Sequence, residues 1–180
     1  MRFMLLLAAI VLPPVCAAAQ TDDARVLDAL RTGDVVVLLR HAATEAGTPT
    51  ADCGTQPRLS AAGRDEARRI GESLRGLGAR IDAVRAGAHC RTQETARLAF
   101  PAIEARTWPA LDPASDRDER IRRTAEVRAA LRDWPAGHGE LWVTHRANVT
   151  ALTGAYVMPG EAVVARVRGG RLEVLGRWRP

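Results

Sequence analysis

The chain has 180 residues, of which 47% are hydrophobic and 26% are charged, with a formal net charge of +5. This length suits one domain, and the composition is that of a soluble globular protein rather than a disordered or fibrous one. All 26 basic residues are arginine, which binds phosphate and carboxylate in a forked geometry but equally reflects the base composition of a genome. The strongly basic pI weakly favours anionic partners. Only 4% of residues are aromatic, so a nucleic-acid partner, which needs stacking side chains, is not expected.

Residues 1–19 have the order of a secretory signal peptide: a basic second residue, an apolar run over 3–12, and small residues before a cut. The apolar run is shorter than the ~20 residues that a membrane-spanning helix needs. We therefore expect cleavage after Ala19, a mature domain over 20–180, a periplasmic or secreted location and no stable membrane insertion. The alternatives are a retained anchor or a lipoprotein cut at Cys16.

The first half of the domain is expected to begin with a helix over 22–30. The apolar run over 34–39 lacks alternation, which is typical of a strand buried on both faces. Residues 42–58 contain Thr, Gly, Pro and Asp without periodicity, so we expect a long active-site loop. Ser60 is a good N-cap for the helix that follows, and Gly78 ends that helix.

The second half continues this alternation of strands and helices. The expected elements are strands over 81–84 and 141–144, helices over 91–100, 116–134 and 148–152, and a hairpin of 163–167 with 172–175. The helix over 116–134 has Ile121, Ala125, Val127 and Leu131 as its apolar positions. The pattern predicts an α/β fold: a three-layer α/β/α sandwich with a mostly parallel central sheet.

Two histidines, His41 and His145, each follow directly on an expected strand, and Arg40 and Arg146 lie beside them. Ligands of open α/β sheets bind at the carboxyl ends of strands. Two strand ends that both carry His and Arg therefore predict one anionic pocket. Taken singly, either histidine is as compatible with a structural role.

Four segments resemble, in order, the signature segments of the histidine phosphatase superfamily, the phosphoglycerate mutase-like proteins. They match its Arg-His-Gly, Leu-Ser-x-x-Gly-x-x-Gln/Glu-Ala and Arg-Ala-x-x-Thr-Ala segments and the strand end with its second histidine. The segments are 37–44, 59–67, 90–96 and 143–145. The chain departs from the pattern at Ala42, where the family has Gly, and at Arg146-Ala147, where Gly-Gly is common.

Two further segments are similar to an exported branch of this superfamily, the lipopolysaccharide core heptose phosphatases. Residues 52–56 match its Asp-Cys-x-x-Gln pattern, and residues 145–154 match its His-x-x-Asn-Val/Ile-Thr-Ala-Leu-Thr-Gly pattern. The resemblance implies a small phosphorylated substrate or a phosphorylated sugar of the cell envelope.

The resemblance implies that neutral His41 attacks phosphorus and forms a phosphohistidine that water then hydrolyses. The expected phosphate ligands all lie in or next to the matched segments. They are Arg40, Arg91, His145, Thr44 and Asn148. Arg40, Arg91 and His145 would also stabilise the charge of the transition state.

The family often has an acidic proton donor between its second arginine and its second histidine. Asp112 is the expected donor, with Asp116 and Glu119 as the other candidates. A turn residue before Pro113 is the alternative interpretation of Asp112. Without a donor, good leaving groups would be favoured, phosphohistidine among them. His89 would either line the pocket or lie at the surface.

Cleavage leaves two cysteines, Cys53 and Cys90, in an oxidising compartment. Both flank pocket segments, which favours a disulfide over two unrelated buried thiols. The scattered cysteines and histidines lack the ligand spacing of a zinc site, so we expect neither a metal nor another cofactor.

The expected function is an exported phosphomonoesterase. A phosphohistidine phosphatase is the first alternative, since it would tolerate a missing acid. A catalytically weak phosphoanion-binding module is the second, supported by Ala42 and by the uncertain acid. Turnover separates an enzyme from a binding module.

Overall fold

The computed structural model describes residues 17–47 and 52–180, with side chains from residue 24 onward. The elements in chain order are α1 (Ala17–Thr32), β1 (Val35–Arg40), α2 (Ala61–Gly76), β2 (Ala83–Ala86), α3 (Cys90–Ala99), β3 (Arg106–Thr107), the 3-10 helix η1 (Pro109–Leu111), α4 (Arg117–Arg132), β4 (Gly139–Thr144), α5 (Arg146–Thr153), β5 (Ala162–Arg168) and β6 (Arg171–Trp178). The expected leader lies outside the described residues except for its last three, which begin α1. Its cleavage stays a prediction.

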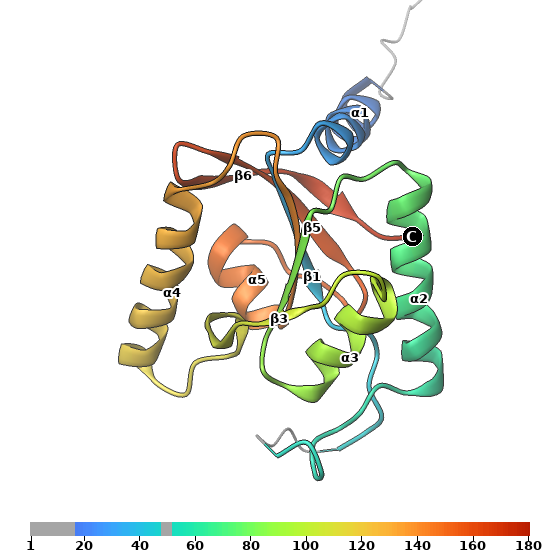
Figure 1. The fold of residues 1–180 in the computed structure, drawn as a ribbon, viewed down its shortest axis with the longest axis vertical. Coiled ribbons are helices and arrows are strands. Elements are labelled where there is room, and N and C mark those ends of the chain that lie inside the picture. The colour runs from blue at the N-terminus through green and yellow to red at the C-terminus, as the bar shows by residue number, and fades with distance from the viewer. Residues whose placement is uncertain (1–16, 48–51) are drawn as a thin grey trace, which may run out of the picture.

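The six strands form one sheet in the order β3-β2-β4-β1-β5-β6 (Figure 1). The four strands from β3 to β1 pair in parallel, whereas β5 and β6 add an antiparallel hairpin at the other side. The mostly parallel sheet that the sequence predicts is confirmed, as is the terminal hairpin.

Strand β1 separates two hydrophobic cores, because alternate side chains of a strand point to opposite faces. Val35, Val37 and Leu39 pack with residues of α1, α2 and α3, while Val36 and Leu38 pack with residues of α4 and α5. Figure 1 shows α2 and α3 on one side of the sheet and α4 and α5 on the other. Burial on both faces explains why β1 lacks an alternating pattern, and the three-layer prediction is confirmed.

The starts of several elements and the apolar face of α4 differ from the expectations. Strand β2 begins at Ala83, two residues later than expected, whereas α1, β4 and α5 begin earlier than expected. In α4, Val127 and Leu131 are buried, but Ile121 is 56% exposed and Ala125 is exposed as well. The early turns of α4 make polar contacts instead of apolar ones, since Arg123 donates to the carbonyls of Asp112 and Pro113.

Ser60 caps α2 as expected, because its hydroxyl accepts the N–H of Gly63 at 3.0 Å. Strand β3 and helix η1, which have two and three residues, were not expected from the sequence. Within the described part of the chain, none of the helices has the length and apolar character needed to cross a bilayer.

Candidate active site

The carboxyl ends of all four parallel strands carry polar residues of one site. His41 follows β1, His145 follows β4, His89 and Arg91 lie at the start of α3 just after β2, and Asp112 follows η1, which comes after β3. Parallel strands end at the same edge of a sheet, so these residues converge. The rings of His41 and His145 lie 5.2 Å apart, which shows that the structure brings the two predicted histidines together.

The hydrogen bonds of His41 select one tautomer of its ring. Nδ1 lies 2.9 Å from the carbonyl oxygen of Ala42, which can only accept, so Nδ1 carries the proton. Nε2 is then left with a lone pair, and it accepts a hydrogen bond from Nε of Arg91 at 3.3 Å. Nε2 is therefore the nucleophilic atom.

Several effects keep His41 neutral. Burial is the largest of them, and together with the electrostatic effects of His145, Arg91 and Arg40 it lowers the pKa of His41 from 6.5 to about 3, although the hydrogen bond to the Ala42 carbonyl opposes these effects. At neutral pH the ring holds no second proton. The lone pair of Nε2 can attack an electrophile such as phosphorus once Arg91 donates to the bound substrate instead of to His41.

The guanidinium of Arg91 joins three site residues. Besides His41, it donates from Nη1 to Oε1 of Gln56 at 3.1 Å, and Nη2 lies 3.3 Å from Nδ1 of His145. Both Arg91 and Gln56 are buried. Gln56 was not expected in the site, although the Asp-Cys-x-x-Gln segment over 52–56 was the available signal.

Arg40 and His145 supply further polar atoms near His41. Nη1 of Arg40 donates to the carbonyl of Val157 at 3.0 Å. Nε of Arg40 and Nε2 of His145 are buried without a hydrogen-bond partner among the described residues. Buried polar atoms are nearly always hydrogen bonded. Together with the guanidinium of Arg91, these two nitrogen atoms can donate hydrogen bonds to a bound oxyanion.

Asp112 lies in the site as a carboxylate. Its Oδ2 accepts the N–H of Ala88 at 2.7 Å, and its Oδ1 lies 2.7 Å from Nδ1 of His89. Nε2 of His145 is 3.4 Å from the same Oδ1, an ion-pair distance rather than a good hydrogen bond. Burial alone would raise the pKa of Asp112, but these contacts with His145, His89 and Ala88 outweigh it and lower the pKa to about 2. The residue expected to donate a proton therefore holds none at neutral pH.

Neighbouring residues fix the position of Asp112. A Cβ on Gly87 would overlap Oδ1 of Asp112, so only glycine leaves room for the carboxylate there. The hydroxyl of Thr144 donates to the carbonyl of Leu111 at 2.5 Å. The amide nitrogen of Asn148 donates to the carbonyl of Asp112 itself at 3.0 Å. Asn148 thus contacts the backbone that carries Asp112, and its role as a phosphate ligand stays a prediction.

Three other expected residues lie further from these contacts. The backbone of Thr44 bridges that of Leu59 in the loop after His41, and its role as a ligand stays a prediction. Asp116 caps α4 by accepting the N–H of Glu119 at 2.8 Å, and both carboxylates are at the surface. Neither contacts the residues around His41, so the structure favours Asp112 among the three acids.

The methyl group of Ala42 packs into a small apolar cluster with Leu59 and Ala67. Ala42 is fully buried, and its N–H donates to the hydroxyl of Thr95 at 3.1 Å. Its backbone is outside the left-handed region, where Asp34 is the only described residue other than glycine. Alanine is accommodated here without backbone strain.

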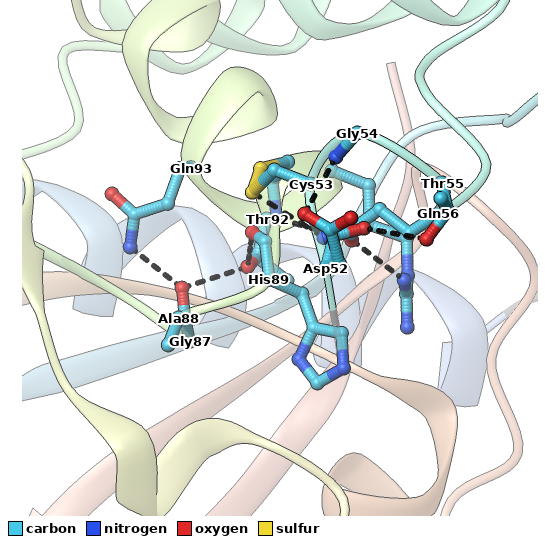
Figure 2. Close-up of a disulfide and its surroundings, with 12 residues drawn as sticks. Asp52, Cys53, Gly54, Thr55, Gln56, Gly87, Ala88, His89, Thr92 and Gln93 are labelled. Atoms are coloured by element: carbon cyan, nitrogen blue, oxygen red, sulfur yellow. Dashed lines mark hydrogen bonds between the residues drawn. A yellow bond between two sulfur atoms is a disulfide. The ribbon is translucent and has the colours of Figure 1, made fainter. Parts of the chain in front are cut away.

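A disulfide joins Cys53 to Cys90, with Cα atoms 5.6 Å apart, and ties the loop after His41 to the start of α3. Figure 2 shows Gln56 beside this bridge. Oε1 of Gln56 accepts the N–H of Cys90 at 3.2 Å, in addition to the Arg91 guanidinium. The bridge therefore holds the residue that orients Arg91, and the expected pairing of the two cysteines is present.

One group of side chains has the donor atoms for a divalent ion. Ligand atoms of His89, Asp112 and His145 all lie within 4.8 Å of one another. The guanidinium of Arg91, 3.3 Å from His145, brings a positive charge next to this group and opposes a cation there. The same charge favours an anion.

Comparisons with known proteins agree with this geometry. Residues 36–170 match the model of the histidine phosphatase superfamily (branch 1). No curated protein matches the chain significantly.

Solved structures share the fold at low sequence identity. The protein histidine phosphatase SixA complexed with tungstate is 18% identical with a TM-score of 0.64, over 81% of this chain and 97% of that one. A putative α-ribazole-5′-P phosphatase from Escherichia coli is 16% identical with a TM-score of 0.62, over 78% and 93%. A putative phosphohistidine phosphatase SixA from Agrobacterium tumefaciens is 18% identical with a TM-score of 0.57, over 82% and 99%.

Proposed function

The chain belongs to the histidine phosphatase superfamily and is a histidine-type phosphatase, and we propose that it is an exported phosphomonoesterase acting through a phosphohistidine on His41. The observation that carries this proposal is the contact between Nε2 of His41 and Nε of Arg91 at 3.3 Å. It places an unprotonated nucleophile against a guanidinium that binds oxyanions in a forked geometry.

The reaction has two steps. Nε2 of His41 attacks phosphorus in line, the P–N bond forms, and the ester P–O bond breaks. Water then attacks the phosphohistidine and releases phosphate. Arg91, Arg40 and His145 surround the nucleophile and would neutralise the equatorial oxygens as charge develops on them. The similar structure that is complexed with tungstate, a tetrahedral oxyanion like phosphate, supports this arrangement.

Phosphate release from p-nitrophenyl phosphate tests the proposal, because this leaving group needs little protonation. We expect the wild-type protein to turn it over and the His41→Ala variant to lose the activity to background. His138→Ala is the matched control. His138 precedes the amino end of β4, whereas His145 follows its carboxyl end, so His138 lies away from the site. If the folded protein binds phosphate but releases none from p-nitrophenyl phosphate, the protein is a phosphate-binding module and the proposal is wrong.

The ionised state of Asp112 favours phosphohistidine phosphatase as a second candidate. Its pKa of about 2 leaves it unable to protonate an alkoxide, whereas a phosphohistidine substrate has a better leaving group. Among the similar structures, one is called the protein histidine phosphatase SixA and another is called a putative phosphohistidine phosphatase SixA. Comparing kcat/KM for a phosphohistidine peptide and an alkyl phosphate separates the two: a preference above ~100-fold for the peptide would replace the phosphomonoesterase proposal.

Export and the envelope sugar phosphate substrate rest on other features. The leader-like residues 1–19 and the Cys53–Cys90 disulfide support export, since such bridges persist in oxidising compartments. The segments over 52–56 and 145–154 support a substrate like that of the heptose phosphatases. Cell fractionation with N-terminal sequencing tests the first point, and a panel of sugar phosphates tests the second. A cytoplasmic protein that keeps residues 1–19 would overturn export.

A further inference from the structure

None of the three acidic candidates offers a proton at neutral pH. The pKa of Asp112 is about 2. The pKa values of Asp116 and Glu119 are also lowered, chiefly because their carboxylates accept backbone N–H groups of Glu119 and Ser115. Protonation of a leaving alkoxide is worth ~10²–10⁴ in rate. If the protein is the phosphomonoesterase proposed above, another group supplies that proton.

We infer that His89, paired with the carboxylate of Asp112, protonates the leaving oxygen; this inference rests on the proposed function. His89 is the N-cap residue of α3, two positions before Arg91. Its Nδ1 lies 2.7 Å from Oδ1 of Asp112. An imidazole held by a carboxylate at one nitrogen presents its other nitrogen in a fixed direction.

The carboxylate of Asp112 orients the ring of His89. A carboxylate only accepts, so Nδ1 of His89 donates to it, and no described residue makes a hydrogen bond to Nε2. In the protonated ring both nitrogens carry a proton, so the proton on Nε2 is the one that can be transferred. His145 and Arg91 are the other ionisable groups nearby. Nη2 of Arg91 lies 3.3 Å from Nδ1 of His145, and burial lowers the pKa of His145.

The ring of His145 is contacted edge-on by two other histidine rings. His41 lies 5.2 Å from it and His89 lies 4.8 Å from it, between centroids. A phosphoryl group held by His145 and Arg91 would thus have the nucleophile on one side and His89 on another. The side chain of His89 is 21% exposed, against 7% for His145 and 6% for Asp112. Figure 2 shows its ring projecting away from the disulfide. His89 is therefore more exposed to solvent than the two residues it contacts, and a leaving group that departs towards solvent can reach it.

The step balances with these residues alone. Nε2 of His41 donates its lone pair to phosphorus while the ester P–O bond breaks, and the electron pair of that bond goes to the leaving oxygen. This oxygen takes the proton from Nε2 of His89, and a neutral alcohol departs. Neutral His89 then accepts a proton from the water that attacks the phosphohistidine, which restores both histidines.

The test compares two substrates with the His89→Gln variant, which cannot carry the proton. We expect kcat/KM for an alkyl phosphate such as ethyl phosphate to fall ~100-fold or more, and that for p-nitrophenyl phosphate to fall less than ~10-fold, because nitrophenolate leaves without a proton. Slower alcohol release in the first turnover, without a burst, would locate the loss in the first step. His138→Gln is the matched control and is expected to leave both substrates unchanged.

Equal losses on both substrates, or no loss on either, would overturn the role of His89. Should His89→Gln fail to fold, Asp112→Asn provides a second test with little change in shape. Without the carboxylate the ring of His89 is no longer held in place, so kcat/KM for ethyl phosphate should fall more than that for p-nitrophenyl phosphate; equal losses on both substrates would contradict the pairing. Failure of the wild-type protein to release phosphate from p-nitrophenyl phosphate would instead refute the proposed function.

Discussion

The Nε atom of Arg91 donates to Nε2 of His41 across 3.3 Å, although the two residues are 50 positions apart in the chain. This contact can form only because β1 and β2 lie on either side of β4 in a parallel array, with their carboxyl ends at one edge. It combines a lone pair and a positive charge at one point, as phosphoryl transfer to a histidine requires.

Replacing Arg91 should impair the chemical step more than substrate binding. Arg91→Lys keeps a charge but loses the fork that joins His41, Gln56 and His145, so we expect kcat to fall ~10²–10³-fold. Arg97→Ala, on the same helix but exposed, is the control and should stay within twofold. Steady-state kinetics on p-nitrophenyl phosphate measure both. If Arg91→Lys raised KM and left kcat unchanged, Arg91 would bind the substrate and the transition state equally well, which would contradict this prediction.

The ring of His41 should stay neutral across the physiological range. Its pKa is lowered from 6.5 to about 3, so in this window the unfolded chain binds a proton that the folded protein does not. His41 therefore contributes less to stability as the pH falls from about 6.5 towards 3. Imidazole ¹⁵N NMR should show a proton on Nδ1 and none on Nε2 from pH 5 to 8. A titration of His41 with a midpoint near 6.5 would show that the pocket does not depress its pKa.

Removing the Cys53–Cys90 bridge should affect both stability and activity. The bridge spans 37 positions, for which the chain-entropy model gives about 4 kcal/mol. Cys53→Ser/Cys90→Ser protein should also turn over more slowly, because Gln56 would lose its contact with Cys53 and hold Arg91 less firmly. Urea unfolding and kinetics measure the two effects. Unchanged activity despite lower stability would show that the bridge does not help to position the active-site residues.

Substituting the family glycine at Ala42 should not improve the enzyme. The methyl group is buried with Leu59 and Ala67, so Ala42→Gly should lower the free energy of unfolding by about 1–2 kcal/mol. Since the methyl group packs in this apolar cluster and the backbone of Ala42 is unstrained, kcat should change less than twofold. Urea unfolding with parallel kinetics measures both quantities. A large rise in kcat would mean that the methyl group obstructs the substrate.

Much of the fold and part of the site could be predicted from the sequence. The apolar runs of β1 and β4 mark strands buried on both faces, and each ends directly at its histidine. The contacts of Gln56 and His89 could not be predicted, because they depend on how the loop and the start of α3 pack together. The charge of Asp112 also depends on tertiary contacts: Ala88 and His89 lie between β2 and α3, and His145 follows β4.

The most direct test of the mechanism is to trap the phosphorylated protein. Acid lability and base stability distinguish a phosphohistidine from a phosphoserine, and mass spectrometry of peptides locates it after a rapid quench. We expect one phosphoryl group, on His41, with none detected in His41→Ala and an unchanged yield in His138→Ala. Phosphate release without a phosphorylated His41 in any quenched sample, or a phosphoryl group on His89 or His145 in its place, would contradict the account.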